Sequence, residues 1–134
     1  MEITVVKEFT FDAAHRLPNH PGKCRSLHGH TYRLQVGVKG HVDPETGMVV
    51  DFGDLKSVIE RTIINALDHS YLNEIETDKD YLTSFPRLVP TSESMVEWLV
   101  KELGGFFQNQ WEGLVVLQLV RLYETPTSYA EWRA

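Results

Sequence analysis

Apolar and polar residues alternate through residues 3–15, which is the pattern of a β-strand with one buried face. The apolar side of this alternation ends in a histidine and consists of Ile3, Val5, Phe9, Phe11, Ala13 and His15. Side chains in a strand point alternately to the two faces of the sheet. The sequence therefore predicts that His15 ends a strand on its core-facing side.

A second strand is predicted over residues 28–40, after a loop at residues 16–27 that contains Pro18, Pro21 and Gly22. Its apolar positions are in phase with two histidines, and together they are His28, His30, Tyr32, Leu34, Val36 and Val38. Residues 43–47 have the composition of a turn. A short third strand at residues 48–52 is therefore expected to form a hairpin with the second.

The apolar spacing then changes to that of helices. Asp51 is a candidate N-cap, Asp54 occupies the third helical position, and the apolar stripe continues to about Leu67. Thr91 or Ser92 is expected to cap a second helix. Gly104 and Gly105 leave open where that helix ends.

The last predicted strand, residues 114–124, is apolar on both faces. A strand with one solvated face should alternate, so this one needs cover on both sides. Helices can cover one face, and a partner subunit is the simplest cover for the other. The predicted order is β-β-β-α-α-β: one α+β domain, residues 1–134, with a four-stranded antiparallel sheet and both helices on one face.

Composition excludes several classes of protein. The chain has 134 residues, 42% of them hydrophobic, and a net charge of −6, which argues against general nucleic-acid binding. No apolar run reaches the roughly 18 residues of a membrane span, and the N-terminus lacks a signal-peptide pattern. One cysteine allows no internal disulfide, so a cytoplasmic location is expected.

Charge is unevenly distributed along the chain. Residues 13–42 contain no acidic residue but include Arg16, Lys23 and Arg25. A basic segment in an acidic protein favours an anionic substrate. Chance clustering on a solvated face is the alternative.

Three histidines are candidates for a metal site. His28 and His30 are two residues apart on one strand, so both imidazoles should point to one face, and His15 ends the neighbouring strand. Three imidazoles with an open fourth position are typical of catalytic zinc. The alternative is three unrelated polar residues at strand ends.

Cys24 lies between two cations, Lys23 and Arg25, which favour the thiolate form that acts as a nucleophile or general base. A buried structural thiol is the alternative. Asp68 and His69 are a candidate supporting pair, although adjacent residues do not usually orient each other. Glu124, near the end of the last predicted strand, is either solvated or able to accept two hydrogen bonds from a guanidine-like ring edge.

These motifs together resemble the 6-pyruvoyltetrahydropterin synthase superfamily over nearly the whole chain, with the 6-carboxytetrahydropterin synthase branch of queuosine precursor synthesis as the closest match. The matching segments are residues 11–17 (FDAAHRL), Cys24 followed after three residues by His28-Gly29-His30, residues 43–49 with Asp51-Phe52, residues 67–69 (LDH) with Leu72-Asn73, residues 90–93 (PTSE) and Glu124-Thr125. The gap between thiol and histidines resembles the queuosine branch, because the pyruvoyl-forming animal enzymes usually have five residues there.

The resemblance implies a tunnelling fold, assembled as trimers or dimers of trimers. It implies that zinc is held by His15, His28 and His30, that Cys24 is the general base, and that Asp68 and His69 form a proton relay. Pterin would be gripped by Glu124, aided by Thr91, Ser92 and Glu93.

The implied substrate is 7,8-dihydroneopterin triphosphate, with Arg16, Lys23 and Arg25 as candidate phosphate contacts. The implied products are 6-carboxy-5,6,7,8-tetrahydropterin, acetaldehyde and triphosphate. Three alternatives remain open: a pyruvoyl-forming synthase on the same scaffold, a metal-binding module without catalysis, and a zinc hydrolase that uses metal-bound water. The last two would not need the thiol.

Overall fold

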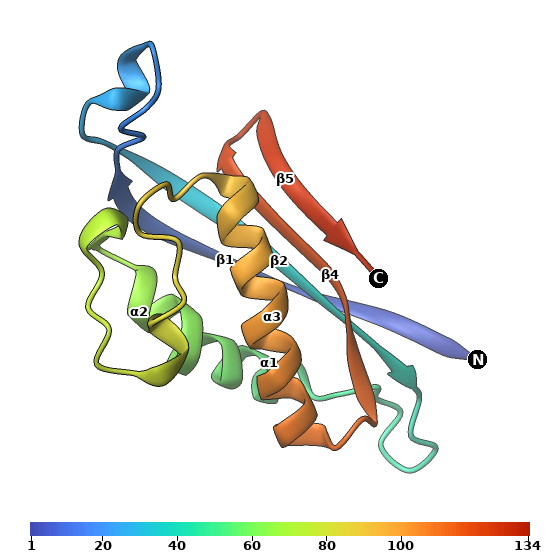
Figure 1. Ribbon diagram of the computed structural model, residues 1–134. Helices are drawn as coiled ribbons and strands as arrows, with labels where there is room; N and C mark the ends of the chain where they lie inside the picture. The colour runs from blue at the N-terminus through green and yellow to red at the C-terminus, as the bar shows by residue number, and fades with distance from the viewer.

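Five strands form a single twisted sheet in the order β3-β1-β2-β4-β5 (Figure 1). The computed structural model describes all 134 residues. The strands are β1 (Glu2–His15), β2 (His28–His41), β3 (Ser70–Tyr71), β4 (Val115–Thr125) and β5 (Ser128–Arg133). The long β1 and β2 pair antiparallel from Glu2↔His41 to His15↔His28, whereas β3 pairs parallel to β1 over two residues only. The predicted α+β class is confirmed.

Helices cover one face of this sheet (Figure 1). The first helical segment runs through α1 (Phe52–Ile59), a π-helical turn (Glu60–Ile64) and α2 (Asn65–Leu67), and the second is α3 (Ser92–Trp111). Both predicted caps are confirmed: Asp51 Oδ1 accepts from Gly53 N at 2.6 Å, and Thr91 Oγ1 accepts from Ser94 N at 3.1 Å. Gly104 and Gly105 lie inside α3 and do not end it.

The core lies between the helices and the sheet. Fully buried members include Tyr32, Leu34 and Val36 from β2 and Ile59 and Leu99 from the helices. Burying each such aliphatic side chain stabilises the fold by about 1.5–3 kcal/mol. The other face of the sheet has no helix over it (Figure 1). None of the helices combines the length and the apolar character that a membrane crossing requires.

The predicted third strand at residues 48–52 is wrong. Asp43 N donates to Met48 O at 2.9 Å, which closes a loop after β2, and Asp51 already caps α1. The sheet has five strands instead of the predicted four. It lacks the strand predicted at residues 48–52 and gains β3 and β5, which the sequence did not predict. β5 follows β4 through a turn at Pro126 and Thr127, since Thr125 pairs with Ser128.

The prediction that the last long strand is apolar on both faces is wrong, because β4 contains a β-bulge. The pairing of β2 with β4 shifts from Gly37↔Leu119 to Val38↔Leu117, so Gln118 is an extra residue. The bulge reverses the alternation. The residues that it brings to the helix-covered face are Val115, Leu117, Val120 and Leu122. Only Val116 and Leu119 are left as aliphatic residues on the other face, so apolar faces no longer argue for a partner subunit.

Candidate metal centre and active site

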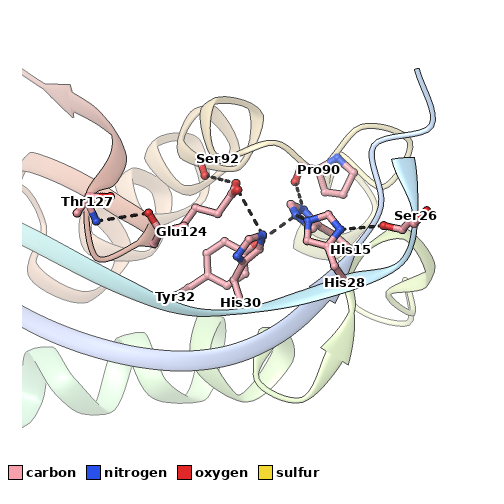
Figure 2. Close-up of polar contacts among 10 residues, drawn as sticks. His15, Ser26, His28, His30, Tyr32, Pro90, Ser92, Glu124 and Thr127 are labelled. Carbon is pink, nitrogen blue, oxygen red and sulfur yellow. Dashed lines mark hydrogen bonds and ion pairs between the residues drawn. The ribbon is translucent and has the colours of Figure 1, made fainter. Parts of the chain in front are cut away.

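Three histidines converge at one end of β1 and β2, on the helix-covered side of the sheet (Figure 2). The strand register places Ala13 opposite His30 and His15 opposite His28, so the imidazoles share a face. One ring nitrogen from each histidine lies within 4.8 Å of the other two. The sequence-based prediction that these residues come together is confirmed.

The hydrogen bonds of the rings fix which nitrogen faces the centre of the cluster. His15 Nδ1 lies 2.9 Å from Pro90 O, and His28 Nδ1 lies 2.8 Å from Ser26 O. Because a carbonyl oxygen only accepts, each Nδ1 donates a proton, and a neutral ring then keeps its lone pair on Nε2. Those two Nε2 atoms are 3.0 Å apart. Two lone pairs so close repel each other unless a cation lies beside them, which is the arrangement of a metal site.

Burial keeps the imidazoles of His15 and His30 in the form that binds metals. His15 is fully buried. Removal from water lowers the pKa of His15 and of His30, and this effect outweighs the negative charge of Glu124, which raises both. The buried His30 Nε2 has no hydrogen-bond partner. The three residues could therefore hold a metal ion through neutral imidazoles and leave further coordination positions open.

Glu124 lies beside this cluster and is oriented by the start of α3 (Figure 2). Ser92 Oγ donates to Glu124 Oε2 at 3.0 Å, whereas Oε1 lies 3.3 Å from His30 Nε2. Since His30 Nε2 makes no hydrogen bond, the second contact is a close approach to a neutral ring. One carboxylate oxygen is therefore fixed and the other is turned toward the metal cluster.

A cavity of about 430 Å³ reaches this region, bordered by both His30 and Glu124. β2 and β4 pair only as far as Arg33↔Tyr123, so the two strands separate beyond this point. Arg33 and Tyr123 form a wall of the cavity, with the guanidinium carbon 3.9 Å from the ring centre. His30 and Glu124 therefore belong both to the metal cluster and to the lining of this cavity.

Asp68 and His69 lie apart from the three histidines. They precede β3 at the outer edge of β1, where Asp68 Oδ1 accepts from Asp12 N at 2.9 Å and Oδ2 is 3.0 Å from His69 Nδ1. The bond from Asp12 N, followed by the contacts with His69, holds the pKa of Asp68 below its usual value. His69 has a left-handed backbone (φ 61°), and this conformation lets two adjacent side chains meet. The sequence alone gave no sign of this.

Cys24 lies on a short helical turn, Lys23–Arg25, in the loop that extends beyond the end of the sheet (Figure 1). Its side chain is half-buried, and its thiol makes no hydrogen bond. Lys23, Arg25 and Arg16 are exposed. The loop is continuous with the metal strands, but the thiol is not part of the histidine cluster.

The three predicted site residues at the start of α3 have different surroundings in the structure. Ser92 contacts Glu124, as described above, whereas the Thr91 side chain is occupied in capping the helix. Glu93 is exposed and lines a separate groove with Val96 and Trp132. Tyr32, whose hydroxyl lies 3.3 Å from His15 Nδ1, is a site neighbour that the sequence did not single out, although its phase with His28 and His30 carried that signal.

An α+β sheet with three metal-competent histidines beside a carboxylate-lined cavity is the arrangement of a metal-dependent enzyme for a small molecule. The sequence pattern of the 6-pyruvoyl tetrahydropterin synthase family matches residues 4–134. The chain belongs to this family.

Individual relatives support the assignment. The 6-carboxy-5,6,7,8-tetrahydropterin synthase of Synechocystis sp. is 39% identical, over 96% of this chain and 91% of the relative. The enzyme of the same name from Haemophilus influenzae is 35% identical, over 96% and 97%. The solved 6-pyruvoyl tetrahydropterin synthase of Caenorhabditis elegans superimposes with a TM-score of 0.82 at 28% identity, covering 100% of this chain and 96% of that one. The expected tunnelling fold is confirmed.

Proposed function

We propose that this protein is a zinc-dependent lyase that converts 7,8-dihydroneopterin triphosphate into 6-carboxy-5,6,7,8-tetrahydropterin, acetaldehyde and triphosphate. The observation that carries the proposal is the convergence of His15, His28 and His30 beside Glu124. It occurs in a chain 35% and 39% identical to relatives that bear the name of this reaction.

Zinc suits the three imidazoles, because it prefers nitrogen ligands and catalytic zinc sites commonly have three protein ligands. Bound there, zinc would polarise substrate oxygens and make neighbouring carbon-bound protons more acidic. The carbonyl oxygens of Pro90 and Ser26 orient two of the ligand rings through their Nδ1 protons. Exchange of the metal is therefore not expected to disturb these ring orientations.

Glu124 provides the recognition of pterin. A carboxylate accepts two hydrogen bonds from the amino-pyrimidine edge of the ring, which matches a guanidine-like donor pair. Ser92 fixes this carboxylate through Oε2. The histidine cluster lies beside this carboxylate, with His30 Nε2 3.3 Å from Glu124 Oε1.

The proton transfers are assigned to Cys24 as general base and to Asp68 with His69 as relay. Within one chain these residues and the histidines do not form one cluster. We therefore propose that sites are shared between subunits of a trimer or a dimer of trimers. The sheet supports such an assembly, because β5 is a free edge and β1 is covered by β3 at only Ala13 and Ala14. Arg16, Lys23 and Arg25 are the proposed phosphate contacts.

The alternative is release of triphosphate without cleavage of the side chain, to give a pyruvoyl product. The 6-pyruvoyl tetrahydrobiopterin synthase of Drosophila melanogaster is also similar, at 30% identity over 92% of this chain and 75% of the relative. The short gap from Cys24 to His28 favours the carboxy product.

Product analysis tests the proposal. Zinc-loaded protein is incubated with 7,8-dihydroneopterin triphosphate, and the pterin products are identified by mass spectrometry, with His28→Ala as control. The expected result is 6-carboxytetrahydropterin from the wild type and none from the variant. A 6-pyruvoyl product would support the alternative, and unchanged substrate would refute both.

A further inference from the structure

The segment that follows α2 is fastened along the metal-binding end of β1. Asp68 accepts from Asp12 N at 2.9 Å, and β3 then pairs Ser70 and Tyr71 with Ala13 and Ala14. At the far end, the side chain of Asn73 reaches the backbone of Arg16. The buried His15 lies between these points, so its strand is held at both ends by one segment.

Asn73 makes both hydrogen bonds of a backbone clamp. Its Oδ1 accepts from Arg16 N at 2.8 Å, and its Nδ2 donates to Arg16 O at 2.9 Å. The pairing of β1 with β3 covers only Ala13 and Ala14, so Arg16 has no strand partner on that edge. A side-chain amide holds an acceptor and a donor side by side, so it can satisfy both the N–H and the C=O of one residue. Asn73 thus replaces the missing strand partner at the end of β1.

The clamp continues into the loop that carries the thiol. Leu17 follows Arg16 directly, and its N–H donates to Cys24 O at 2.8 Å. Because Arg16 O and Leu17 N belong to one rigid peptide group, a bond that fixes the first also orients the second. Two consecutive hydrogen bonds therefore connect Asn73 with the backbone of Cys24.

Asn73 itself is anchored in the segment of the proposed relay. It lies on the short turn Leu72–Glu74, four residues after His69, and its neighbour Leu72 is fully buried in the core. A rigid position for the amide follows from this packing. One side chain thus joins the strand of His15, the loop of Cys24 and the segment of Asp68 and His69.

We propose that Asn73 is a positioning residue that fixes Cys24 and His15 relative to the segment of Asp68 and His69. The catalytic meaning of this role rests on the proposed function, because that function makes these three groups reactive. Asn73 touches no reacting atom and acts only through Arg16 and Leu17. Loss of the amide releases the start of the loop and exposes the half-buried thiol.

The test compares Asn73→Ala and Asn73→Asp with the wild type in the zinc-loaded, full-length protein. Asn109→Ala is the matched control, because Asn109 is exposed on α3 and its side chain makes no hydrogen bond. Cys24 is the only cysteine, so the alkylation rate with iodoacetamide reports on that thiol alone. For each variant we also measure zinc affinity by chelator competition, kcat/KM and the thermal midpoint.

For Asn73→Ala, we expect the alkylation rate to rise severalfold and kcat/KM to fall about 10–100-fold, as when residues that support a metal site are lost. Asn73→Asp keeps the acceptor for Arg16 N but loses the donor, so intermediate values are expected. Asn73→Asp also tests the proposal if Asn73→Ala does not fold. The Asn109→Ala control should match the wild type throughout.

A purely structural role would lower the thermal midpoint and leave the alkylation rate and kcat/KM of the folded variants at wild-type values, which would overturn the proposal. The outcome is separable from the proposed function. If the wild type forms no pterin product but the variants still alter alkylation and zinc affinity, the positioning role stands and the reaction is wrong.

Discussion

Two polar clusters, the three histidines and the pair of Asp68 and His69, lie on either side of the same strand and differ in their exposure to solvent. His15, at the end of β1, is fully buried, whereas the side chain of His69, at the outer edge of β1, is 79% exposed. Burial lowers the pKa of His15, so its ring stays neutral. At the edge, hydrogen bonds lower the pKa of Asp68 and keep a charged carboxylate beside an accessible imidazole. The first cluster is thus suited to a metal ion and the second to proton transfer.

Removal of one buried imidazole should have the largest effect. For His28→Ala we expect loss of bound zinc and of activity together, because two remaining imidazoles no longer hold the ion. Zinc per chain is measured by elemental analysis after dialysis. His41→Ala, at the exposed end of β2, should keep both. Full zinc occupancy in His28→Ala would refute the ligand assignment.

Removal of the thiol should abolish chemistry and leave the buried cluster intact. For Cys24→Ala we expect turnover to fall by about 10²–10⁴, the range for loss of a general base. Zinc content and pterin binding should stay at wild-type values, as measured by elemental analysis and fluorescence titration. Wild-type turnover in this variant would favour the metal-water hydrolase instead.

Truncation of Thr91 separates support of the fold from binding of substrate. Its hydroxyl accepts from Ser94 N and caps α3, the helix that presents Ser92. We expect Thr91→Ala to lower the free energy of unfolding by about 1 kcal/mol, as measured in urea. KM for the pterin substrate should not change, and a large rise in KM would show that Thr91 contacts the substrate.

The charge of Asp68 should give the smallest effect, and one that depends on pH. Because its pKa is lower in the folded protein than its ordinary value of 3.8, Asp68 contributes stability above that value. The contribution is lost as the pH falls through the folded-state pKa. The difference in unfolding free energy between wild type and Asp68→Asn should therefore shrink from about pH 6 to about pH 3. A constant difference would mean that its charge is not involved.

The sequence predicted the elements that carry the buried cluster, because local rules decide them. Alternation located β1 and β2, and the caps Asp51 and Thr91 marked the starts of both helical segments. With the strands in place, the phase of His28 and His30 fixed the face on which they meet. Gly104 and Gly105 left the end of the second helix unpredicted. In the structure the helix continues through them, because Leu103 and Phe107 pack into the core.

The parts that the sequence did not predict depend on pairing between distant segments. The bulge at Gln118 arises from how β4 fits β2, and no local pattern marks it. Residues 128–133 form a short strand that pairs with β4, and the sequence predicted no strand there. The clamp from Asn73 to Arg16 joins residues 57 positions apart, so only the folded structure reveals it.

The most direct test of the three-histidine metal site is X-ray absorption at the zinc edge of the metal-loaded protein. The account predicts three imidazole nitrogens and one oxygen ligand at roughly 2.0–2.1 Å, with no sulfur. The spectrum of Cys24→Ala should be the same. A sulfur shell at about 2.3 Å would make Cys24 a ligand and not a base, and would contradict the separation of metal site and thiol proposed here.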